Sequence, residues 1–570
     1  MKNILFAFLF FLPAVVSAQS WQWVKTSISP PGGVDGWACK TDLNNNVYTT
    51  AIWFGDSLKI GDSLFRGSGS QAVIAKYDCE GNFRWASSSS HGQCTPVNVT
   101  TDVEGNVYLF GVFGTDSLMF GNHLVLNNHI DSQLFFEPSL YGCYFLIKYD
   151  SSGNIIWSKT GDNILTSLGA GITTDSHSNI YVVGSFLNSL IKIGSYTLIN
   201  SSHDSTDIFI AKYDSNGNVL WVKSYGGYSN DWGTAIAVSQ DGFIYASGSF
   251  ASPTISFDSH SLNHTGTNIF HWMWQYLDTW LIKLDVSGNV VWARGSTGNA
   301  LVENMTVDKG DGIYIGGAVH DSSFLSFGND TLKNAMISNG AFVAKYDNNG
   351  NSIWTNGIYP ISVSSYHFGG NFISGMAVNA KTNNIWVSCA LCAEDTLTGI
   401  LLDSITVVHF GDAIDPCVLA EFNSSGTLQQ YFTYPSGGDD NTWISADNLG
   451  NIYFSSDTWS SLQFGTYSVV PFAGETMILA KYGNSDCAVN SIIDVRRATC
   501  TILPNPADQL ITVSSPDFKI EKISICNLIG QTIFVQSYNT NYAQIIVANL
   551  PAGMYLMRIN ETEVVKFVKQ

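Results

Sequence analysis

The sequence predicts an all-β chain: a seven-bladed β-propeller closed by its N-terminal strand, followed by a small immunoglobulin-like β-sandwich. Two short sequence units alternate seven times along residues 19–482, and both have the pattern of a β-hairpin. The chain is rich in residues that strands and tight turns use, with 52 Gly, 25 Tyr and 16 Trp. Charged residues make up only 13% of the chain, which argues against long solvated helices.

The first 18 residues have the pattern of a secretory signal peptide. Lys2 precedes an uninterrupted apolar run from Ile4 to Val16, and small residues follow up to Ala18. This run is too short for a retained membrane helix, so we expect cleavage after Ala18 and no membrane span in the mature chain. Because Gln19 rather than a cysteine would follow the cut, a lipid anchor is not expected.

The first repeated unit reads IAKYDxxGNxxW. Five clear copies occur, at Ala75–Trp85, Ile147–Trp157, Ala211–Trp221, Ile282–Trp292 and Ala344–Trp354. Two weaker copies begin at Ala420 and Ala480. Their lysine position falls at residues 76, 148, 212, 283, 345, 421 (a glutamate) and 481, a spacing that fits long propeller blades.

A second unit, DxxGNVYxxGxF, precedes each copy of the first. It begins at Asp42, Asp102, Asp175, Asp241, Asp308, Asn379 and Asp447. In both units, alternating apolar residues run into an Asp/Asn-Gly turn and out again, as in a hairpin. Two hairpins make four strands, so one pair of units predicts one blade and seven pairs predict seven blades.

The last copy of the first unit stops at Tyr482, without its tryptophan strand. The mature N-terminus, SWQWVKTS, supplies a matching tryptophan, Trp23. We therefore expect Trp21–Ser27 to form the outer strand of the seventh blade, beside Met477–Tyr482. A ring closed in this way has no free sheet edge between its ends.

These repeats resemble the seven-bladed propeller repeats of exported bacterial proteins. The resemblance covers about residues 19–482 and rests on the D-x-x-G-N-x-Y-x-x-G and K-x-D-x-x-G patterns. It implies a fold and no common chemistry.

After a connector at 483–499, residues 500–570 predict a β-sandwich of alternating strands and PNP, IGQ and PAG turns. The matching residues are Pro504, Asn505 and Pro506 at the entry, Gly530 in NLIGQ, Gly553 in LPAGMY, and Lys566 in the tail KFVK. In this order they resemble the type A C-terminal sorting domain of the type IX (Por) secretion system. The resemblance implies Sec export, transit across the outer membrane with the type IX machinery as partner, and a secreted or outer-surface location.

Charge and side chains exclude several functions. The formal net charge of −20 would repel a nucleic-acid backbone. The propeller region has only Arg66, Arg84 and Arg294, too scattered to hold an acidic substrate as sialidases do. The Asp-x-x-Gly-Asn turns are better explained by hydrogen bonds to their own backbone than by calcium. We predict no catalytic residue, metal site or cofactor.

The ten cysteines of this exported chain can form disulfides, but their connectivity does not follow from the sequence. Cys389 and Cys392 form a CxxC pair that follows a strand-like run, so a structural role is favoured over a redox role.

Two long connections carry the candidate ligand-binding residues. These are Phe135, Phe136 and Tyr141 in the second repeat, and Phe270, Trp272, Trp274 and Tyr276 in the fourth. Aromatic residues on variable loops suit a site for a glycan or a protein, but large apolar residues usually bury themselves, which favours a plug folded down over the channel. We expect a non-catalytic binding or adhesion protein; a polysaccharide hydrolase or lyase, or a structural component of the cell surface, is the alternative.

Overall fold

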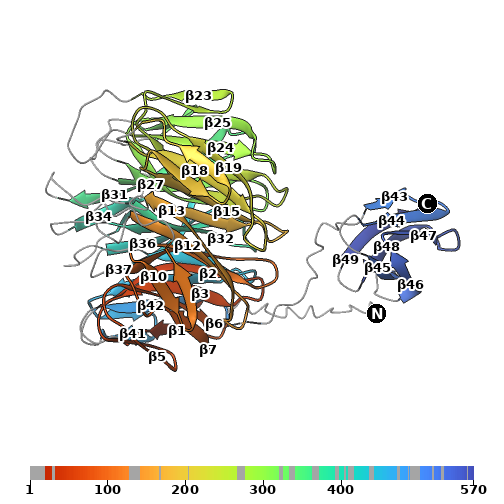
Figure 1. Cartoon of the computed structure of the whole chain (residues 1–570), viewed down its shortest axis with the longest axis horizontal. Coiled ribbons are helices and arrows are strands. Elements are labelled where there is room, and N and C mark those ends of the chain that lie inside the picture. Colours follow the sequence, from red (N-terminus) through yellow and green to blue (C-terminus); the bar gives the residue numbers. More distant parts are fainter. Residues whose placement is uncertain are drawn as a thin grey trace, which may run out of the picture. The chain divides into compact units, whose positions relative to one another are not determined.

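The computed structural model describes residues 19–28, 33–127, 141–165, 169–202, 205–265, 277–319, 325–332, 340–362, 372–391, 397–402, 406–408, 416–435, 442–471, 475–485, 487, 501–515, 519–527, 532–560 and 563–570. All regular structure in these residues is β-strand, so the all-β prediction is confirmed. None of them forms a helix that could span a membrane. The chain divides into two compact units, Met1–Cys487 and Ala488–Gln570 (Figure 1).

The strands of the first unit pair antiparallel in groups of four, which we number as sheets 1 to 7. Sheet 1 orders β2 (Val34–Thr41), β3 (Val47–Trp53), β6 (Gln71–Tyr77) and β7 (Phe83–Ser88). Sheet 2 orders β8 (Cys94–Thr101), β9 (Val107–Phe113), β12 (Tyr141–Tyr149) and β13 (Ile155–Leu165). Sheet 3 orders β14 (Gly171–Thr174), β15 (Ile180–Phe186), β18 (Asp207–Tyr213) and β19 (Val219–Tyr225).

The remaining sheets repeat this order. Sheet 4 has β20 (Asp231–Val238), β21 (Ile244–Phe250), β24 (Asp278–Leu284) and β25 (Val290–Thr297). Sheet 5 has β26 (Ala300–Val307), β27 (Ile313–Val319), β30 (Gly340–Tyr346) and β31 (Ser352–Ser362). Sheet 6 has β32 (Phe372–Val378), β33 (Ile385–Ala390), β36 (Pro416–Phe422) and β37 (Leu428–Pro435). Sheet 7 has β38 (Trp443–Ala446), β39 (Ile452–Thr458), β42 (Thr476–Gly483) and, as its outer strand, β1 (Ser20–Thr26).

Sheet 7 joins the two ends of the first unit. β1 pairs antiparallel with β42, with Trp21 opposite Tyr482 and Trp23 opposite Lys481. Figure 1 shows this pair as a strand from the red end of the chain beside one from the blue end. The N-terminal strand therefore pairs with the segment that the sequence predicts for it.

Each sheet also carries a small hairpin between its second and third strands, which the sequence prediction treated as a plain connection. These hairpins are β4 (Ser57–Ile60) with β5 (Ser63–Arg66), β10 (Ser117–Phe120) with β11 (His123–Leu126), β16 (Leu190–Ile193) with β17 (Tyr196–Ile199), β22 (Thr254–Phe257) with β23 (His260–Asn263), β28 (Ser326–Phe327) with β29 (Asp330–Thr331), β34 (Leu397–Leu402) with β35 (Thr406–Val408), and β40 (Leu462–Phe464) with β41 (Tyr467–Val469). In five of these hairpins an aromatic or aliphatic residue is followed by glycine at the turn, at positions 60–61, 120–121, 193–194, 327–328 and 464–465, and Gly121 has a φ of 57°.

Several of the small hairpins form β-pairs or β-bridges with the outer strand of the preceding sheet, or with the residues that follow it. β28 pairs with β25, β34 pairs with β31, and a bridge joins Ser89 to Phe120. The same contact recurs between sheets 7 and 1, where Ile28, just after β1, bridges Lys59 of β4. The N-terminal strand is thus held by both its own sheet and the next one.

The aspartates of the DxxGN turns organise the turn backbone. Asp42 Oδ1 accepts hydrogen bonds from the amides of Asn44 and Asn46, and its Oδ2 accepts bonds from the Asn46 side chain and the Tyr48 hydroxyl. Asp102 repeats the arrangement with its own turn. Both oxygens are therefore occupied by the turn, as the structural interpretation of these aspartates requires. The described residues contain no group of three side chains placed to hold a metal ion.

Neighbouring sheets are tied together by one repeated pair of donors, which we call the inter-sheet latch. The outer-strand tryptophan indole and the third-strand lysine ammonium both donate to a single carbonyl in the last turn of the next sheet. The donors and acceptors are Trp85 and Lys76 to Ser151, Trp157 and Lys148 to Ser215, Trp221 and Lys212 to Val286, Trp292 and Lys283 to Asn348, Trp354 and Lys345 to Ser424, and Trp23 and Lys481 to Cys79. The tryptophans thus pack between sheets, as their recurrence predicts.

Close approach explains the glycine of these turns. Gly153 has a φ of 89°, and a Cβ there would lie 2.6 Å from the Trp85 ring. A Cβ at Gly81 would likewise lie 2.8 Å from the Trp23 ring. Only glycine combines this backbone conformation with room for an indole above it.

The latch lysines are buried and partly compensated within their own sheet. Lys76 Nζ lies 5.0 Å from the centre of the Tyr48 ring and 4.0 Å from Asp42 Oδ2. Burial lowers the pKa of the Lys76 ammonium, and the nearby Asp42 carboxylate opposes that shift. The backbone carbonyl of the next sheet supplies an acceptor for this desolvated group.

The contact between sheets 6 and 7 is different, because β42 leads into the connector rather than into a turn. The latch positions of sheet 6 are Glu421 and Gln430, which hydrogen-bond to each other over 2.7 Å. Trp21 of β1 instead packs edge-to-face against Phe432, with ring centres 5.9 Å apart. Aromatic packing therefore replaces the latch at this contact.

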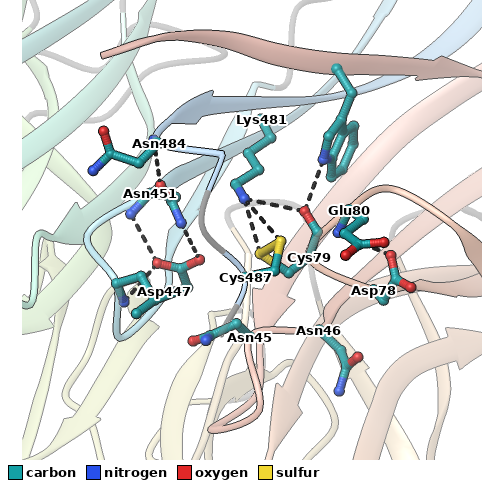
Figure 2. The surroundings of a disulfide bond; sticks show 12 residues. Asn45, Asn46, Asp78, Cys79, Glu80, Asp447, Asn451, Lys481, Asn484 and Cys487 are labelled. Atoms are coloured by element: carbon teal, nitrogen blue, oxygen red, sulfur yellow. Dashed lines mark hydrogen bonds between the residues drawn. A yellow bond between two sulfur atoms is a disulfide. The ribbon is translucent and has the colours of Figure 1, made fainter. Parts of the chain in front are cut away.

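A disulfide adds a covalent link between sheets 7 and 1. It joins Cys79, in the last turn of sheet 1, to Cys487, which follows β42 by a few residues (Figure 2). Lys481 Nζ lies 3.2 Å from the Cys79 carbonyl and 2.9 Å from its sulfur. The bond spans 408 residues of sequence, so it restricts the unfolded chain strongly.

The second unit is a sandwich of two sheets. One orders β43 (Thr501–Leu503), β44 (Leu510–Ser514) and β47 (Tyr542–Ile546), and the other orders β46 (Thr532–Thr540), β45 (Ile520–Cys526), β48 (Gly553–Ile559) and β49 (Glu563–Lys569). Inward residues of both sheets share one core, including Ile511, Ile545, Ile525, Met557 and Phe567.

Truncating the N-terminal latch tryptophan tests its contribution to stability. Trp23 is 7% exposed and donates to the Cys79 carbonyl. We expect Trp23→Ala to lower the free energy of unfolding by roughly 3–5 kcal/mol, as for other buried large aromatics. Denaturant unfolding of the mature chain measures this. The control is Tyr228→Ala, a side chain 82% exposed, expected to change stability by less than about 0.5 kcal/mol. An equally small effect at Trp23 would contradict the assigned packing.

A buried glutamate beside Gly33 predicts a pH dependence of stability. Burial, reinforced by the Asp457 carboxylate, raises the pKa of Glu475 to about 7, although a hydrogen bond with Asp35 opposes the shift. The protonated carboxyl is favoured in the folded chain, so its contribution is full below about pH 4.5 and is lost as the pH rises to 7. After solvent screening we expect a loss on the order of 1 kcal/mol over this range.

Unfolding measured at several pH values tests this effect. Glu475→Gln is expected to flatten the pH dependence, whereas Glu80→Gln, at an exposed position, leaves it unchanged. A Glu475→Gln chain with the wild-type pH dependence would show that other groups are responsible.

Candidate functional site

A cavity of about 820 Å³ lies among the first strands of all seven sheets, β2, β8, β14, β20, β26, β32 and β38. Side chains of these strands bond to the backbone of the first strand of the preceding sheet: Thr101 Oγ1 donates to the Thr41 carbonyl, and Thr174 Oγ1 donates to the Thr101 carbonyl. Thr41 Oγ1 in turn donates to the Ala446 carbonyl of β38. The first strands thus form much of the cavity wall, and side chains on them are held in fixed positions.

β-bulges direct side chains into the cavity. The register of the first and second strands shifts between Gly36 and Cys39 in sheet 1, and between Val302 and Asn304 in sheet 5. A bulge changes which residues of a strand face a given side. Trp37 and Lys40 of the first bulged strand, and Glu303 of the second, line the cavity.

Among the described residues that line the cavity, Lys40 is the only lysine. Its side chain is exposed to the cavity, and it makes no ion pair or hydrogen bond with the described residues. The surrounding protein lowers the pKa of the Lys40 ammonium through desolvation. An unpaired cation in such a place favours an anionic ligand.

Glu303 is a second charged-type residue of the cavity lining without a hydrogen-bond partner for one of its oxygens. Its Oε2 atom is buried and has no hydrogen-bond partner among the described residues. Burial raises the pKa of the Glu303 carboxyl well above its usual range. In its neutral form this carboxyl can both donate and accept a hydrogen bond.

Three aromatic side chains lie on neighbouring strands of the cavity wall. Trp37 is on β2, Trp443 on β38 and Phe372 on β32, and each is partly buried. On the other strands the lining residues nearest the turns are small, namely Thr101, Thr174, Val238 and Val307. The cavity therefore has one aromatic side and continues past small residues to the turns between first and second strands.

These residues escaped the sequence analysis because they do not repeat. Two positions before the turn aspartate, sheet 1 has Lys40 where the other sheets have threonine, alanine or serine. Five positions before it, sheet 5 has Glu303 where no other sheet has a charge. A charge that breaks a repeated pattern of small residues was the available signal.

The predicted loop residues lie largely outside the described residues. This holds for Phe135, Phe136, Phe270, Trp272, Trp274 and Tyr276. Tyr141 opens β12, but its side chain is likewise outside the description. The proposal of a binding site in these loops stays a prediction.

The scarce arginines of the first unit serve structural contacts. Arg84 pairs with Asp78 in its own turn, over 2.5 Å. Arg294 donates to the carbonyls of Gly350 and Asn349, next to the latch of the following sheet. Neither arginine lines the cavity.

The sorting-motif residues converge on the last strand of the second unit. Asn505, between Pro504 and Pro506, accepts a hydrogen bond from the Val568 amide and donates one to the Lys566 carbonyl. Lys566 itself is exposed on β49. Gly553 opens β48, which pairs with β49, while Gly530 lies outside the described residues. The Pro-Asn-Pro segment at the start of the second unit is thus hydrogen-bonded to the Lys-Phe-Val-Lys segment at its end.

The family comparison decides the role of this unit. Residues 501–570 match the secretion system C-terminal sorting domain. They are a sorting domain. The protein is accordingly exported by type IX secretion, to the cell surface or the surroundings of the cell.

Similarities outside the sorting domain are distant. An uncharacterized WD repeat-containing protein of Acanthamoeba polyphaga mimivirus is 28% identical over 290 residues, 45% of this chain and 20% of that protein. The regulatory protein FlaEY of Caulobacter vibrioides is 30% identical over 18% of this chain and 11% of its own. The chain thus spans about a fifth or less of these relatives.

Solved structures align with this chain only at low sequence identity and low TM-score. PorZ, a surface component of the type IX secretion system of Porphyromonas gingivalis, aligns with 92% of this chain and 69% of its own, at 10% identity and a TM-score of 0.28. The rhamnogalacturonan lyase YesW aligns with 80% of this chain and 75% of its own, at 11% identity and a TM-score of 0.34.

Proposed function

We propose that the mature chain is a closed seven-bladed propeller that acts outside the cell as a non-catalytic binding protein for a glycan or a protein. Its binding site is the central cavity. Seven sheets of like order, the pairing of β1 with β42 and the Cys79–Cys487 link support closure. The sorting domain supplies export and takes no part in binding.

The observation that carries the proposal is the side-chain set of the cavity. Lys40 and Glu303 have no partner among the described residues, although desolvation of such groups is costly. The aromatic side chains Trp37, Trp443 and Phe372 leave part of their surface in the cavity. A cavity of this size with an apolar side and few polar groups matches the usual form of a ligand site.

Binding is favoured over hydrolysis because the cavity offers one available carboxyl. Glycoside hydrolysis usually requires two carboxyl groups on either side of the bond. The other carboxylates among the described lining residues, Asp42, Asp102 and Asp175, accept hydrogen bonds from their own turns. Glu303 is therefore without a catalytic partner in this part of the chain.

A binding assay with product analysis tests the proposal. The mature full-length chain is applied to an array of polysaccharides and surface proteins, and bound material is checked for cleavage. We expect binding without new products, and an at least tenfold weaker affinity for Trp443→Ala, since truncating a central aromatic commonly costs more than 1 kcal/mol.

The control variant is Tyr228→Ala, at a side chain 82% exposed outside the cavity. It is expected to bind as the wild type does. Binding that Trp443→Ala leaves unchanged would place the site elsewhere, and cleavage of a bound polysaccharide would show an enzyme.

A further inference from the structure

We infer that the cavity binds a saccharide that carries an anionic group, with Lys40 as the anchor for the charge. This inference rests on the proposed binding function and adds the class of ligand. The steps are the charge of Lys40, the aromatic side chains beside it and the hydrogen-bonding capacity of Glu303.

The positive charge of Lys40 favours a ligand with an anionic group. Lys40 is the lysine of the described cavity lining, which also contains Glu303 and three aspartates, Asp42, Asp102 and Asp175, that accept hydrogen bonds from their own turns. None of the described carboxylates pairs with its ammonium group. The five other latch lysines with the same surroundings as Lys76 all have acceptors, which sets Lys40 apart. An anionic ligand group would restore the interactions that this ammonium lacks.

The aromatic side chains of the cavity favour a ligand that contains a sugar ring. Trp37 lies three residues before Lys40 on the same bulged strand, and Trp443 lies on the neighbouring strand β38. The partly exposed indole rings suit the C–H face of a sugar ring, which is apolar, flat and rigid. A flexible acidic peptide would lose more conformational entropy on entering the same space.

Glu303 fits the hydroxyl groups of such a ring. Its Oε2 atom lacks a partner, and it lies on β26, in a different sheet from Lys40. A hydroxyl group can donate to or accept from a carboxyl in either protonation state. The anion and a hydroxyl can therefore be held by separate sheets, which orients the sugar.

A matched set of trisaccharides tests the ligand class. Trigalacturonate, its carboxyl-reduced counterpart trigalactose, and a sulfated trigalactose are titrated into the mature full-length chain by calorimetry. We expect one or both anionic trisaccharides to bind at least about tenfold more tightly than trigalactose, the effect of one charge-assisted hydrogen bond. The two anionic probes show whether the charge is a carboxylate or a sulfate.

Variants separate charge from stacking. Lys40→Gln is expected to remove the preference for the anionic trisaccharides, whereas Lys59→Gln, an exposed lysine of sheet 1 outside the cavity, keeps it. Trp443→Ala is expected to weaken anionic and neutral trisaccharides to the same degree. Near-UV circular dichroism of each variant confirms that the fold is kept.

The possible failures are distinguishable. Equal binding of neutral and anionic trisaccharides, weakened by Trp443→Ala, would overturn the anionic class and keep the cavity as a binding site. Lys40-dependent binding of an acidic peptide, with no saccharide bound, would replace the saccharide class by a peptide. If the chain binds none of these probes, the inference is wrong, and the array of surface proteins then decides the proposed function separately.

Discussion

The first unit depends on one repeated interaction, the donation of a tryptophan indole and a lysine ammonium to a single carbonyl of the next sheet. For Trp85 and Lys76, the two donors lie 3.2 Å and 2.9 Å from the Ser151 oxygen. A neutral hydrogen bond contributes about 1 kcal/mol and one from a charged donor about 1.5–3 kcal/mol, so each latch stabilises the contact between two sheets substantially. Since the acceptor belongs to the neighbour, each latch joins two sheets, whereas in sheet 6, which lacks the latch, Gln430 donates to Glu421 of the same sheet. The conserved spacing of Lys, Gly and Trp within each repeat follows from this arrangement.

The same interaction explains where the repeat breaks down. Sheet 7 takes its outer strand from the N-terminus, so no turn follows β42 to accept the donors of sheet 6. A lysine at 421 would be buried there without that carbonyl, and the chain has Glu421, which accepts from Asn384 and Gln430. The aromatic contact of Trp21 with Phe432 takes over the packing. The degraded sixth copy is therefore a consequence of joining the two chain ends, rather than random loss.

Much of this architecture could be predicted from the sequence, because it is encoded by repetition. The hairpin turns and the match between Trp23 and the recurring tryptophans are local patterns, and the structure pairs the N-terminal strand as they indicate. The small hairpins were missed because most of their strands have only two to four residues, too few to show a recognisable periodicity. The Cys79–Cys487 pair was not predictable, since its partners meet only when the two ends come together. Lys40 and Glu303 were missed for the opposite reason: each occurs once, and only the bulged strands bring them to one cavity.

The account of the site depends on closure, because the cavity has a complete wall only if sheet 7 stands beside sheet 1. Amide hydrogen exchange at β42 tests this most directly. If β1 covers it in solution, the peptide Thr476–Gly483 should exchange as slowly as β18, Asp207–Tyr213, which is covered by its own outer strand β19. If Thr476–Gly483 instead exchanges as fast as the outer strand Val219–Tyr225, the N-terminal strand does not close the ring and the account is wrong.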